Sequence, residues 1–331
     1  MAYRYVPMLR SKAGEANALA NLAASDKQRL FPLIHVSEAP AAAFVPNAGA
    51  AWNGRPMALD GMFNFGFTGS TAHFTQLFTG LGRAGVLVIP SIECDAPAPY
   101  VTSLARYIGR FASGLVVKAS LRQLPRVSAW VIAQGWQTSN VDLVIMAGHA
   151  ADYDPPQFAD FLARAIATHI PNPHGWRTVT LASSAAPKDA SALAYGRNDV
   201  PRLDWQAWQA AHTNVGFQLD YGDYGIAHPD LTEPPGVAMA RATVSVRYTI
   251  DDFWIILKGR PTGGPKGQPM QQQYRRHAAT LAADPQFGGL TNCWGDQRIQ
   301  QIAAGGAGWS RPVWVAISVN RHLSFVADRL P

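Results

Sequence analysis

Short apolar runs recur along the chain, and most are nearly continuous in hydrophobic residues rather than alternating with polar ones. Continuous runs of this length are typical of strands buried on both faces, as in a parallel sheet that is covered by helices. Each run therefore predicts one strand. The runs are YVPML from Tyr5, FPLIHV from Phe31, VLVIPSIE from Val86, GLVVKAS from Gly114, VDLVIMAG from Val141, TVTLASS from Thr178, VGFQLDYG from Val215, and a last region from Val244 to Lys258.

The segments between these runs have apolar residues at the 3.6-residue spacing of amphipathic helices. They predict helices at residues 14–22, 100–111 and 155–170, and Asp154 followed by two prolines is typical of a helix start. Eight strands alternating with helices favour an α/β fold of the (β/α)8 type, a TIM-like barrel. A doubly wound open sheet is the alternative, and it ranks second because no strand leads into G-x-G-x-x-G.

Two regions depart from a plain barrel. Residues 37–85 are too long for one connection and rich in Ala, Pro and Gly, so we expect an inserted segment over the top of the barrel and a helix near 71–81. The region from Val244 to Lys258 is either the last barrel strand or a hairpin that turns at residues 250–252. Residues 260–331 are expected to form a C-terminal helical extension of a single domain, 1–331.

The amino-acid composition indicates the cellular compartment and the amount of apolar surface that is available for a core. The 331 residues are 48% hydrophobic and 15% charged, which supplies apolar surface for a sizeable core. The sequence has no 18-residue apolar run and no signal-peptide pattern at its start, so we expect neither a membrane span nor a membrane partner. Cys94 and Cys293 match no metal spacing, which fits a reducing, cytoplasmic location, although a disulfide between them stays open.

The net charge of +6 is spread along the chain, and its densest part runs from Lys258 through Arg260 and Lys266 to Arg275 and Arg276. A solvated basic face is the favoured interpretation of this stretch. A patch for phosphates or nucleic acid is the alternative. The sequence contains no P-loop, zinc-finger spacing or aromatic RNA-binding motif that would favour the alternative.

Active sites of such barrels lie at the C-terminal ends of the strands, so polar residues that end the apolar runs are the site candidates. The candidates for catalysis are Asp220, Asp223, Glu93 and Lys118. The candidates for substrate binding are Arg10, Lys12, Glu38, His149, Gln218, Tyr221, Tyr224, Arg247 and Lys258.

Lys118 lies inside the apolar run GLVVKAS, where contact with water alone does not require a lysine. An unpaired buried ammonium costs several kcal/mol, so a buried Lys118 needs a carboxylate partner or an anionic ligand. An ion pair with Glu93 or Asp220 across the barrel is slightly favoured over a ligand contact.

The segment LDYGDYG contains the densest group of candidates, because Asp220 and Asp223 flank Gly222 directly after a predicted buried strand. Paired carboxylates are suited to a hard divalent metal ion, or one of them to the role of general base. An Asp-Gly turn with capping carboxylates is an equally weighted structural alternative.

Several stretches together resemble the Beta protein family of phages and prophages. They are YVPMLRSKAGEANALANL with FPLIHV, then LDYGDYGIAHP, VRYTIDDFWIILKGR, NCWGDQRIQQIA and WVAISVNRH, in the order of the family. The resemblance covers about half of the chain. It implies a protein of mobile elements that is linked to phage defence, in which members accompany and restrain a toxic partner. It implies no catalytic residues.

Three functions are compatible with these observations. The resemblance implies a component of an anti-phage defence or toxin-restraining module, acting through a ligand or protein partner. Cations and carboxylates that converge at one mouth favour instead a metal-dependent or acid–base enzyme, hydrolase-like, that acts on a phosphorylated or anionic substrate or on nucleic acid. The excess of basic over acidic residues favours nucleic-acid binding as the third function. The sequence leaves it open whether the chain is an enzyme.

Overall fold

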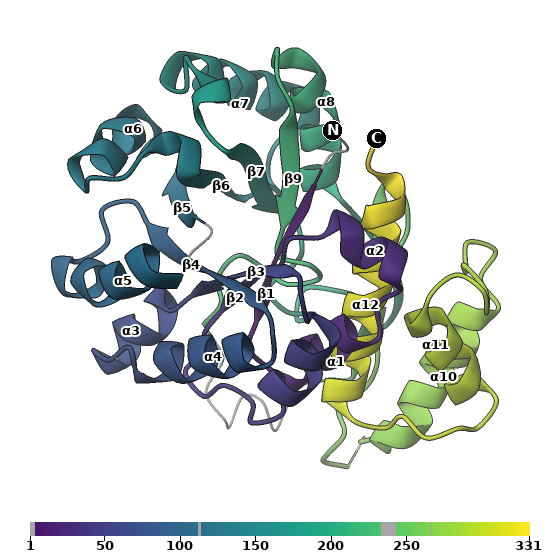
Figure 1. Ribbon diagram of the computed structural model, residues 1–331. Helices are drawn as coiled ribbons and strands as arrows, with labels where there is room; N and C mark the ends of the chain where they lie inside the picture. The colour runs from purple at the N-terminus through teal and green to yellow at the C-terminus, as the bar shows by residue number, and fades with distance from the viewer. Residues whose placement is uncertain (1–3, 112–113, 233–242, 266) are drawn as a thin grey trace.

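The computed structural model describes residues 4–111, 114–232, 243–265 and 267–331, and it shows a closed barrel of eight parallel strands surrounded by helices (Figure 1). The (β/α)8 fold predicted from the sequence is therefore confirmed. In order around the barrel the strands are β1 (Tyr5–Arg10), β2 (Leu33–His35), β3 (Pro56–Asp60), β4 (Leu87–Glu93), β5 (Leu115–Ser120), β6 (Val141–His149), β7 (Thr178–Ser184) and β9 (Leu219–Asp223).

The helices predicted near residues 14–22, 71–81, 100–111 and 155–170 are present on the outside of the barrel. At the start of α7, the Asp154 side chain accepts a hydrogen bond from Gln157 N at 3.2 Å, which is the expected cap. The helices are α1 (Ala13–Ala20), α2 (Ala24–Arg29), α3 (Met62–Thr68), α4 (Ala72–Arg83), α5 (Ala98–Phe111), α6 (Leu124–Ala133), α7 (Pro155–His169) and α8 (Leu203–Asn214), with short helical turns at Val45–Gly49, Thr138–Asn140 and Pro173–Gly175.

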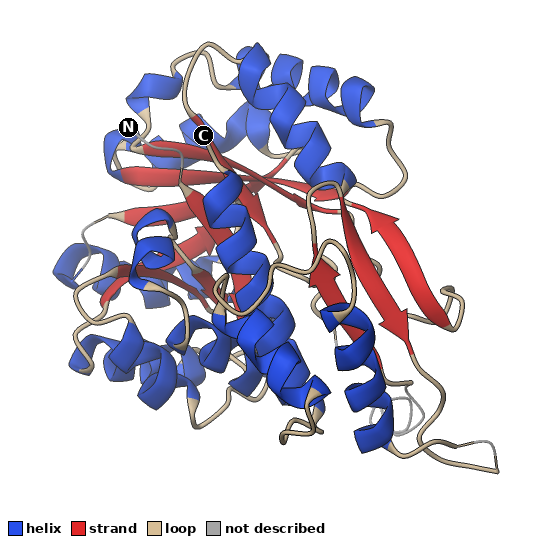
Figure 2. Cartoon of the chain, turned by 90° about the vertical axis from the view of Figure 1, so that its right-hand side faces the viewer, coloured by secondary structure: helices blue, strands red, loops and turns tan. Residues whose placement is uncertain are grey.

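The segment 37–85 is not an insertion outside the barrel, because it supplies β3, which pairs with β2 and β4. The region from Val244 to Lys258 is correspondingly not a barrel strand. It forms the alternative hairpin of β10 (Ser245–Thr249) and β11 (Phe253–Lys258), with Ile250 N bonded to Phe253 O at the turn. β11 also pairs with β8 (Gly196–Pro201) in a separate three-stranded antiparallel sheet (Figure 2).

Three C-terminal helices, α10 (Met270–Ala282), α11 (Trp294–Ala303) and α12 (Arg311–Arg329), lie together on one side of the barrel (Figure 1). The long helix α12 contacts both α1 and β10. Its Leu323 belongs to the barrel core, while Ile317 belongs to the core of the three-stranded sheet. We propose on this basis that the chain is one domain. None of the helices in the described ranges is long and apolar enough to cross a bilayer.

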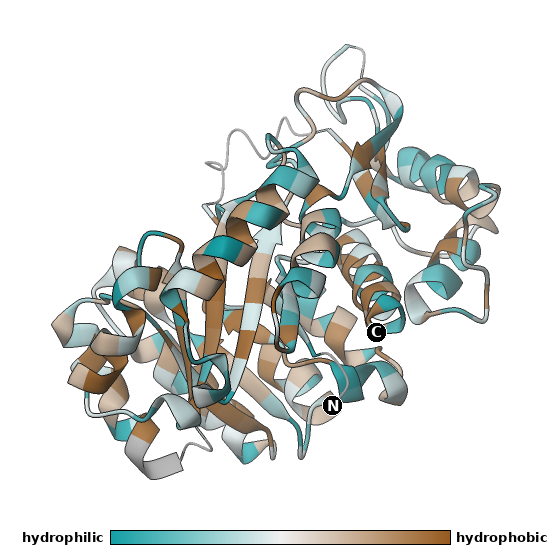
Figure 3. Cartoon of the chain, turned by 90° about the horizontal axis from the view of Figure 1, so that it is seen from above, coloured by the Kyte–Doolittle hydropathy of each residue, from teal (hydrophilic) through white to brown (hydrophobic). Residues whose placement is uncertain are grey.

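Side chains along each barrel strand alternate between the barrel interior and the helices outside. The interior contains an apolar cluster that includes Val6, Leu33, Val116 and Val144, and Figure 3 shows the apolar character of these strands. On β9, Gly222 faces this interior, since a Cβ there would lie 2.9 Å from the Cβ of Ala182. Positions 220 and 224 face inward with it, while positions 221 and 223 face the helices.

Candidate functional site

Three buried polar side chains meet at the C-terminal end of the barrel, on β2, β3 and β5. Lys118 forms an ion pair with Asp60 Oδ2, and His35 Nδ1 lies 3.3 Å from the same oxygen. Asp60 Oδ1 accepts a hydrogen bond from Met62 N at 2.8 Å. The ion pair expected for Lys118 is present, but the partner is Asp60 rather than Glu93 or Asp220.

The pKa values of this group follow from burial and mutual attraction. Burial alone would raise the pKa of Asp60, but Lys118 and His35 outweigh it and hold that pKa well below its usual range. Burial opposes the charge of Lys118, yet Asp60 and Glu93 raise its pKa above the ordinary value. Burial and the neighbouring Lys118 lower the pKa of His35. At neutral pH the group thus consists of an ammonium, a carboxylate and a neutral imidazole.

Glu93 and Tyr224 complete the polar floor of the mouth. Glu93 ends β4 directly beside Lys118 of β5, and burial raises its pKa although Lys118 opposes the shift. The Tyr224 ring stacks on His35 with 6.5 Å between ring centroids, and burial raises the pKa of its hydroxyl to about 12. Burial thus makes the charged form of Glu93 less favourable than it is in water, while the adjacent ammonium of Lys118 partly offsets this effect.

These side chains open on a cavity of about 540 Å³, which is the size of many small-molecule sites. Its walls are apolar and include Met62, Phe63, Phe67 and Met146. His35 also lines the cavity and is 4% exposed, and its Nε2 has no hydrogen-bond partner among the described residues. Since Nδ1 of the neutral ring donates to Asp60, Nε2 is a buried acceptor without a partner, and a hydroxyl or N–H group of a ligand would satisfy it.

A second cavity, of about 570 Å³, lies next to the first, because Tyr224 and residues 230–232 line both. Arg10 and Arg247 line only this second cavity. Arg10 is paired with Glu15 at 3.0 Å, whereas Arg247 donates to the carbonyl oxygens of Ile226 and Pro187. Burial lowers the pKa of Arg247 to about 10, which leaves it a cation at neutral pH.

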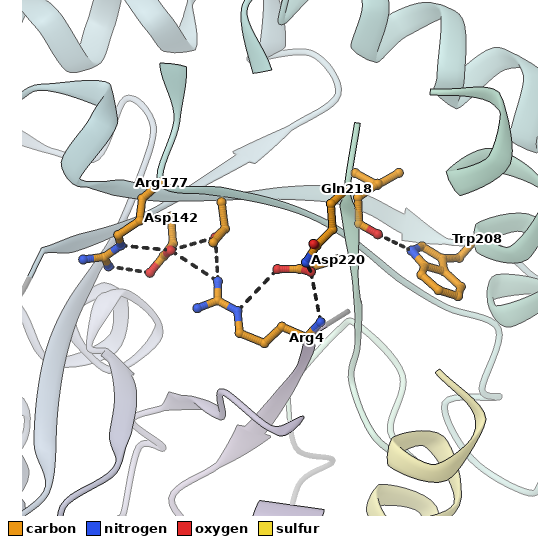
Figure 4. Close-up of polar contacts among 8 residues, drawn as sticks. Arg4, Asp142, Arg177, Trp208, Gln218 and Asp220 are labelled. Carbon is orange, nitrogen blue, oxygen red and sulfur yellow. Dashed lines mark hydrogen bonds and ion pairs between the residues drawn. The ribbon is translucent and has the colours of Figure 1, made fainter. Parts of the chain in front are cut away.

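Asp220 lies at the opposite end of the barrel from Lys118, so the prediction that both line one mouth is wrong. The strand begins at Leu219 rather than Val215, which makes Asp220 the second residue of β9. It accepts a hydrogen bond from Arg4 N at 3.0 Å and one from Gln218 at 3.0 Å, in a network with Asp142 (Figure 4). Gln218 is likewise at this N-terminal end, so neither residue belongs to the mouth.

Asp223 points out of the barrel, in the direction opposite to Asp220. Its carboxylate accepts from Tyr5 Oη at 2.7 Å and from Gly225 N at 2.8 Å, and it lies 2.7 Å from His322 Nε2 on α12. Two carboxylates on opposite faces of one strand cannot share a metal ion, which removes the predicted divalent site. Among the described residues, no group of three His, Cys, Asp or Glu side chains is placed to hold a metal.

Tyr221 also faces the helices, where its hydroxyl donates to Asp204 at 3.2 Å. Lys258 lies on the three-stranded sheet and donates to Ser191 O and Leu193 O. Both predicted substrate contacts therefore lie outside the mouth, and the Tyr221 side chain packs against the helices.

The remaining predicted contacts are near the rim. His149 ends β6, with its ring 4.3 Å from that of His228 and its Nε2 3.2 Å from Ala186 O. Lys12 is the half-buried residue before α1, and Glu38 is exposed after β2. None of these three lines the cavity beside Lys118.

Sequence reasoning missed Asp60 because it missed β3. The strand PMALD has five residues and follows an Asn-Gly turn in a segment that we assigned to an insertion. The aspartate directly after a short apolar run was the available signal, and it is the same signal that identified Glu93.

Comparisons with known proteins give one family and one distant structural likeness. A family model described as Beta protein matches residues 5–328, nearly the whole chain. None of the curated proteins matches it. Among solved structures, a mutant tryptophan synthase α-subunit from a hyperthermophile, Pyrococcus furiosus, aligns at a TM-score of 0.38 and 11% identity over 68% of this chain and 89% of that one. The barrel assignment rests on the strand order itself.

Proposed function

Because this chain belongs to the Beta protein family, we propose that it is a ligand-binding (β/α)8 barrel of an anti-phage defence or toxin-restraining module, and that its mouth performs acid–base chemistry on a small polar ligand. The observation behind this proposal is the cavity in which Glu93, Lys118 and the unpartnered Nε2 of His35 come together. Unsatisfied buried polar atoms and perturbed carboxyl groups that face one cavity favour a ligand site over a purely structural cluster.

Each polar side chain has a distinct role in the proposed chemistry. Glu93 gives a proton to the ligand or takes one from it, since its raised pKa brings the acid form closer to neutral pH. The Lys118 ammonium, held in place by Asp60, polarises a carbonyl or phosphoryl oxygen of the ligand. His35 forms a hydrogen bond to the ligand through Nε2. The apolar walls would contact a hydrocarbon or aromatic portion.

The adjoining cavity favours a ligand with an anionic end. Lys118 is neutralised by Asp60, so the floor of the first cavity has little net positive charge of its own. Arg247 is half-buried, and among the described residues its guanidinium donates hydrogen bonds to carbonyl oxygens only, so its charge is available to an anion in the second cavity. A phosphorylated or carboxylated molecule that extends past Tyr224 would reach both cavities.

Family membership supports the biological setting. We propose that a protein partner encoded in the same module responds to the state of the mouth, and that the protein works in the cytoplasm, where free thiols such as Cys94 and Cys293 persist. A chain that acts only by binding a partner would depend on its outer surface and not on the mouth.

The test is the protection of cells against phage, measured as plaquing efficiency in cells that express the module. Glu93→Gln keeps the size of the side chain but removes the acid, and loss of a general acid or base lowers the rate about 100- to 10,000-fold. We expect protection to be lost at an unchanged melting temperature. Asp160→Asn is the matched control, because this exposed carboxylate on α7 only pairs with Arg164. Full protection by Glu93→Gln would overturn the proposal in favour of pure partner binding.

A further inference from the structure

A third cavity, of about 300 Å³, lies between the three-stranded sheet and α10, apart from the barrel mouth. Among the described residues that line it there are four cations and no carboxylate. The lining includes the exposed ring of Tyr195 as well. The cationic residues are Arg197, Lys258, Arg260 and Arg276.

His277 of α10 provides a second and independent indication of a ligand. The side chain lines the cavity and is 8% exposed, and its Nε2 has no hydrogen-bond partner among the described residues. Burial and the neighbouring Arg276 lower the pKa of His277 to about 4, so the imidazole is neutral in the cell. In the neutral tautomer that has its proton on Nε2, this nitrogen donates a hydrogen bond to a ligand oxygen that reaches it, which removes the cost of an unpaired buried group.

The cations around this histidine are only partly neutralised by the protein. Arg197 is paired with Asp199 and Asp284. Lys258 donates instead to two carbonyl oxygens, and Arg260 stacks over the Tyr195 ring at 4.0 Å, where Lys258 also lies at 5.2 Å. Among the described residues, no carboxylate forms an ion pair with Arg260 or Arg276. Guanidinium groups without a carboxylate partner beside an exposed aromatic ring are suited to a phosphate ester.

We propose that this cavity binds a phosphate group, with Arg260 and Arg276 pairing with its charge and His277 Nε2 bonding one of its oxygens. Tyr195 lies where the remainder of a nucleotide can pack against its ring. The same chemistry is offered by a mononucleotide and by the backbone of single-stranded nucleic acid. The site is separate from the mouth and does not depend on the function proposed for it.

Binding is measured by fluorescence anisotropy with a labelled oligothymidylate and by calorimetry with adenosine monophosphate. Arg276→Gln removes one charge-assisted contact, and we expect about a tenfold loss of affinity. Arg275→Gln is the matched control, because Arg275 is the adjacent exposed arginine on α10 but does not line the cavity. It makes the same charge change, and we expect its affinity to stay within about twofold of wild type.

His277→Phe keeps an aromatic ring and removes the nitrogen, and it is expected to weaken binding while the melting temperature is kept. Binding of both probes with equal sensitivity to Arg276→Gln identifies a nucleotide-sized site. If only the oligonucleotide binds, the site takes a nucleic-acid strand. In that case Arg276→Gln should reduce the slope of log affinity against log salt concentration by about 0.7. Either result supports the site. The proposal is overturned if neither probe binds, if Arg275→Gln and Arg276→Gln lose affinity equally, or if folded His277→Phe binds as wild type.

Discussion

The two ends of the barrel both bury carboxylates, but they surround them differently. At the N-terminal end, Asp142 accepts hydrogen bonds from the side chains of Arg4, Arg177 and Thr178. At the C-terminal end, Asp60 pairs with Lys118, while the adjacent His35 keeps an unpartnered Nε2 that borders a cavity. The first arrangement consists of side chains that pair with one another and line none of the three cavities, whereas the second faces an open volume that we propose is filled by a ligand.

This difference shows that buried charge alone does not identify a functional site. Asp220 and Asp60 are both almost fully buried, yet Asp220 belongs to a network that ties Arg4, at the start of β1, to β6, β7 and β9. Such a network holds the closed end of a barrel together. The distinguishing feature of the mouth is the open volume that its unpartnered nitrogen, His35 Nε2, borders. Arg4 Nε in the N-terminal network also has no hydrogen-bond partner among the described residues, but it lies in an ion pair with Asp220 and borders none of the three cavities.

The largest effect is expected at the mouth, from Lys118→Met. Removing the ammonium leaves Asp60 buried without its counter-ion, which should lower the free energy of unfolding by about 3–5 kcal/mol. Adding Asp60→Asn should recover most of this loss without restoring activity. Urea unfolding measures both variants, and a single variant that loses less than about 1 kcal/mol would contradict the buried ion pair.

The matching change at the other end is Asp142→Asn. It weakens charge-assisted hydrogen bonds from Arg4 and Arg177, but their side chains are 26% and 29% exposed, so water replaces part of the interaction. We expect a loss of about 2–3 kcal/mol in urea unfolding. Protection against phage, scaled to the amount of folded protein, should stay at the wild-type level. If folded Asp142→Asn lost protection, the N-terminal end of the barrel would also contribute to function, which contradicts the comparison.

Acid should separate wild type from the variant that has both Lys118→Met and Asp60→Asn. Since the folded-state pKa of Asp60 is lowered, its contribution to stability is complete above the unfolded value near 3.8 and is lost as the pH falls through the folded-state value. The double variant lacks this contribution. Its urea midpoint should therefore fall less than that of wild type between about pH 5 and pH 2. Parallel curves would show that Asp60 is not held as an anion by its neighbours.

The smallest effect on stability is expected for Glu93→Gln. Burial raises the pKa of Glu93, so the folded state gains little from its charge at neutral pH. Replacing it by the neutral amide should change the free energy of unfolding by less than about 1 kcal/mol. Thermal unfolding at neutral pH measures this change. A much larger loss of unfolding free energy would identify Glu93 as a structural partner of Lys118 and not as a group that acts on a ligand.

The barrel itself could be predicted from the sequence because seven of its strands are continuous apolar runs, and such runs are rare outside buried parallel strands. β3 could not, because Pro56–Asp60 is short and lies in a segment rich in Gly and Pro. The region from Val244 to Lys258 was counted as the eighth strand, but its two halves pair with each other and with β8. The predicted number of barrel strands was thus correct, although one of the eight was assigned to the wrong segment.

The site was harder to predict, because strand register decides which residues reach the mouth. In VGFQLDYGDYG, a start at Leu219 places Asp220 at the closed end, whereas a start at Val215 would have placed it near the top. Alternation then turns Tyr221 and Asp223 outward and leaves only Tyr224 at the mouth. The structure places Glu93 and Lys118 beside the cavity at the C-terminal end, and this position could be expected because both lie near the ends of long strands whose bounds were clear.

The most direct test of the mouth as a ligand site is native mass spectrometry of protein isolated from phage-infected cells. Wild type, Glu93→Gln and His35→Leu would be compared. Glu93→Gln keeps the binding contacts but lacks the acid, so we predict that it retains a small molecule whose mass adds to that of the chain. His35→Leu, which removes the nitrogen that faces the cavity, should retain none. Identical spectra for all three proteins would contradict the account.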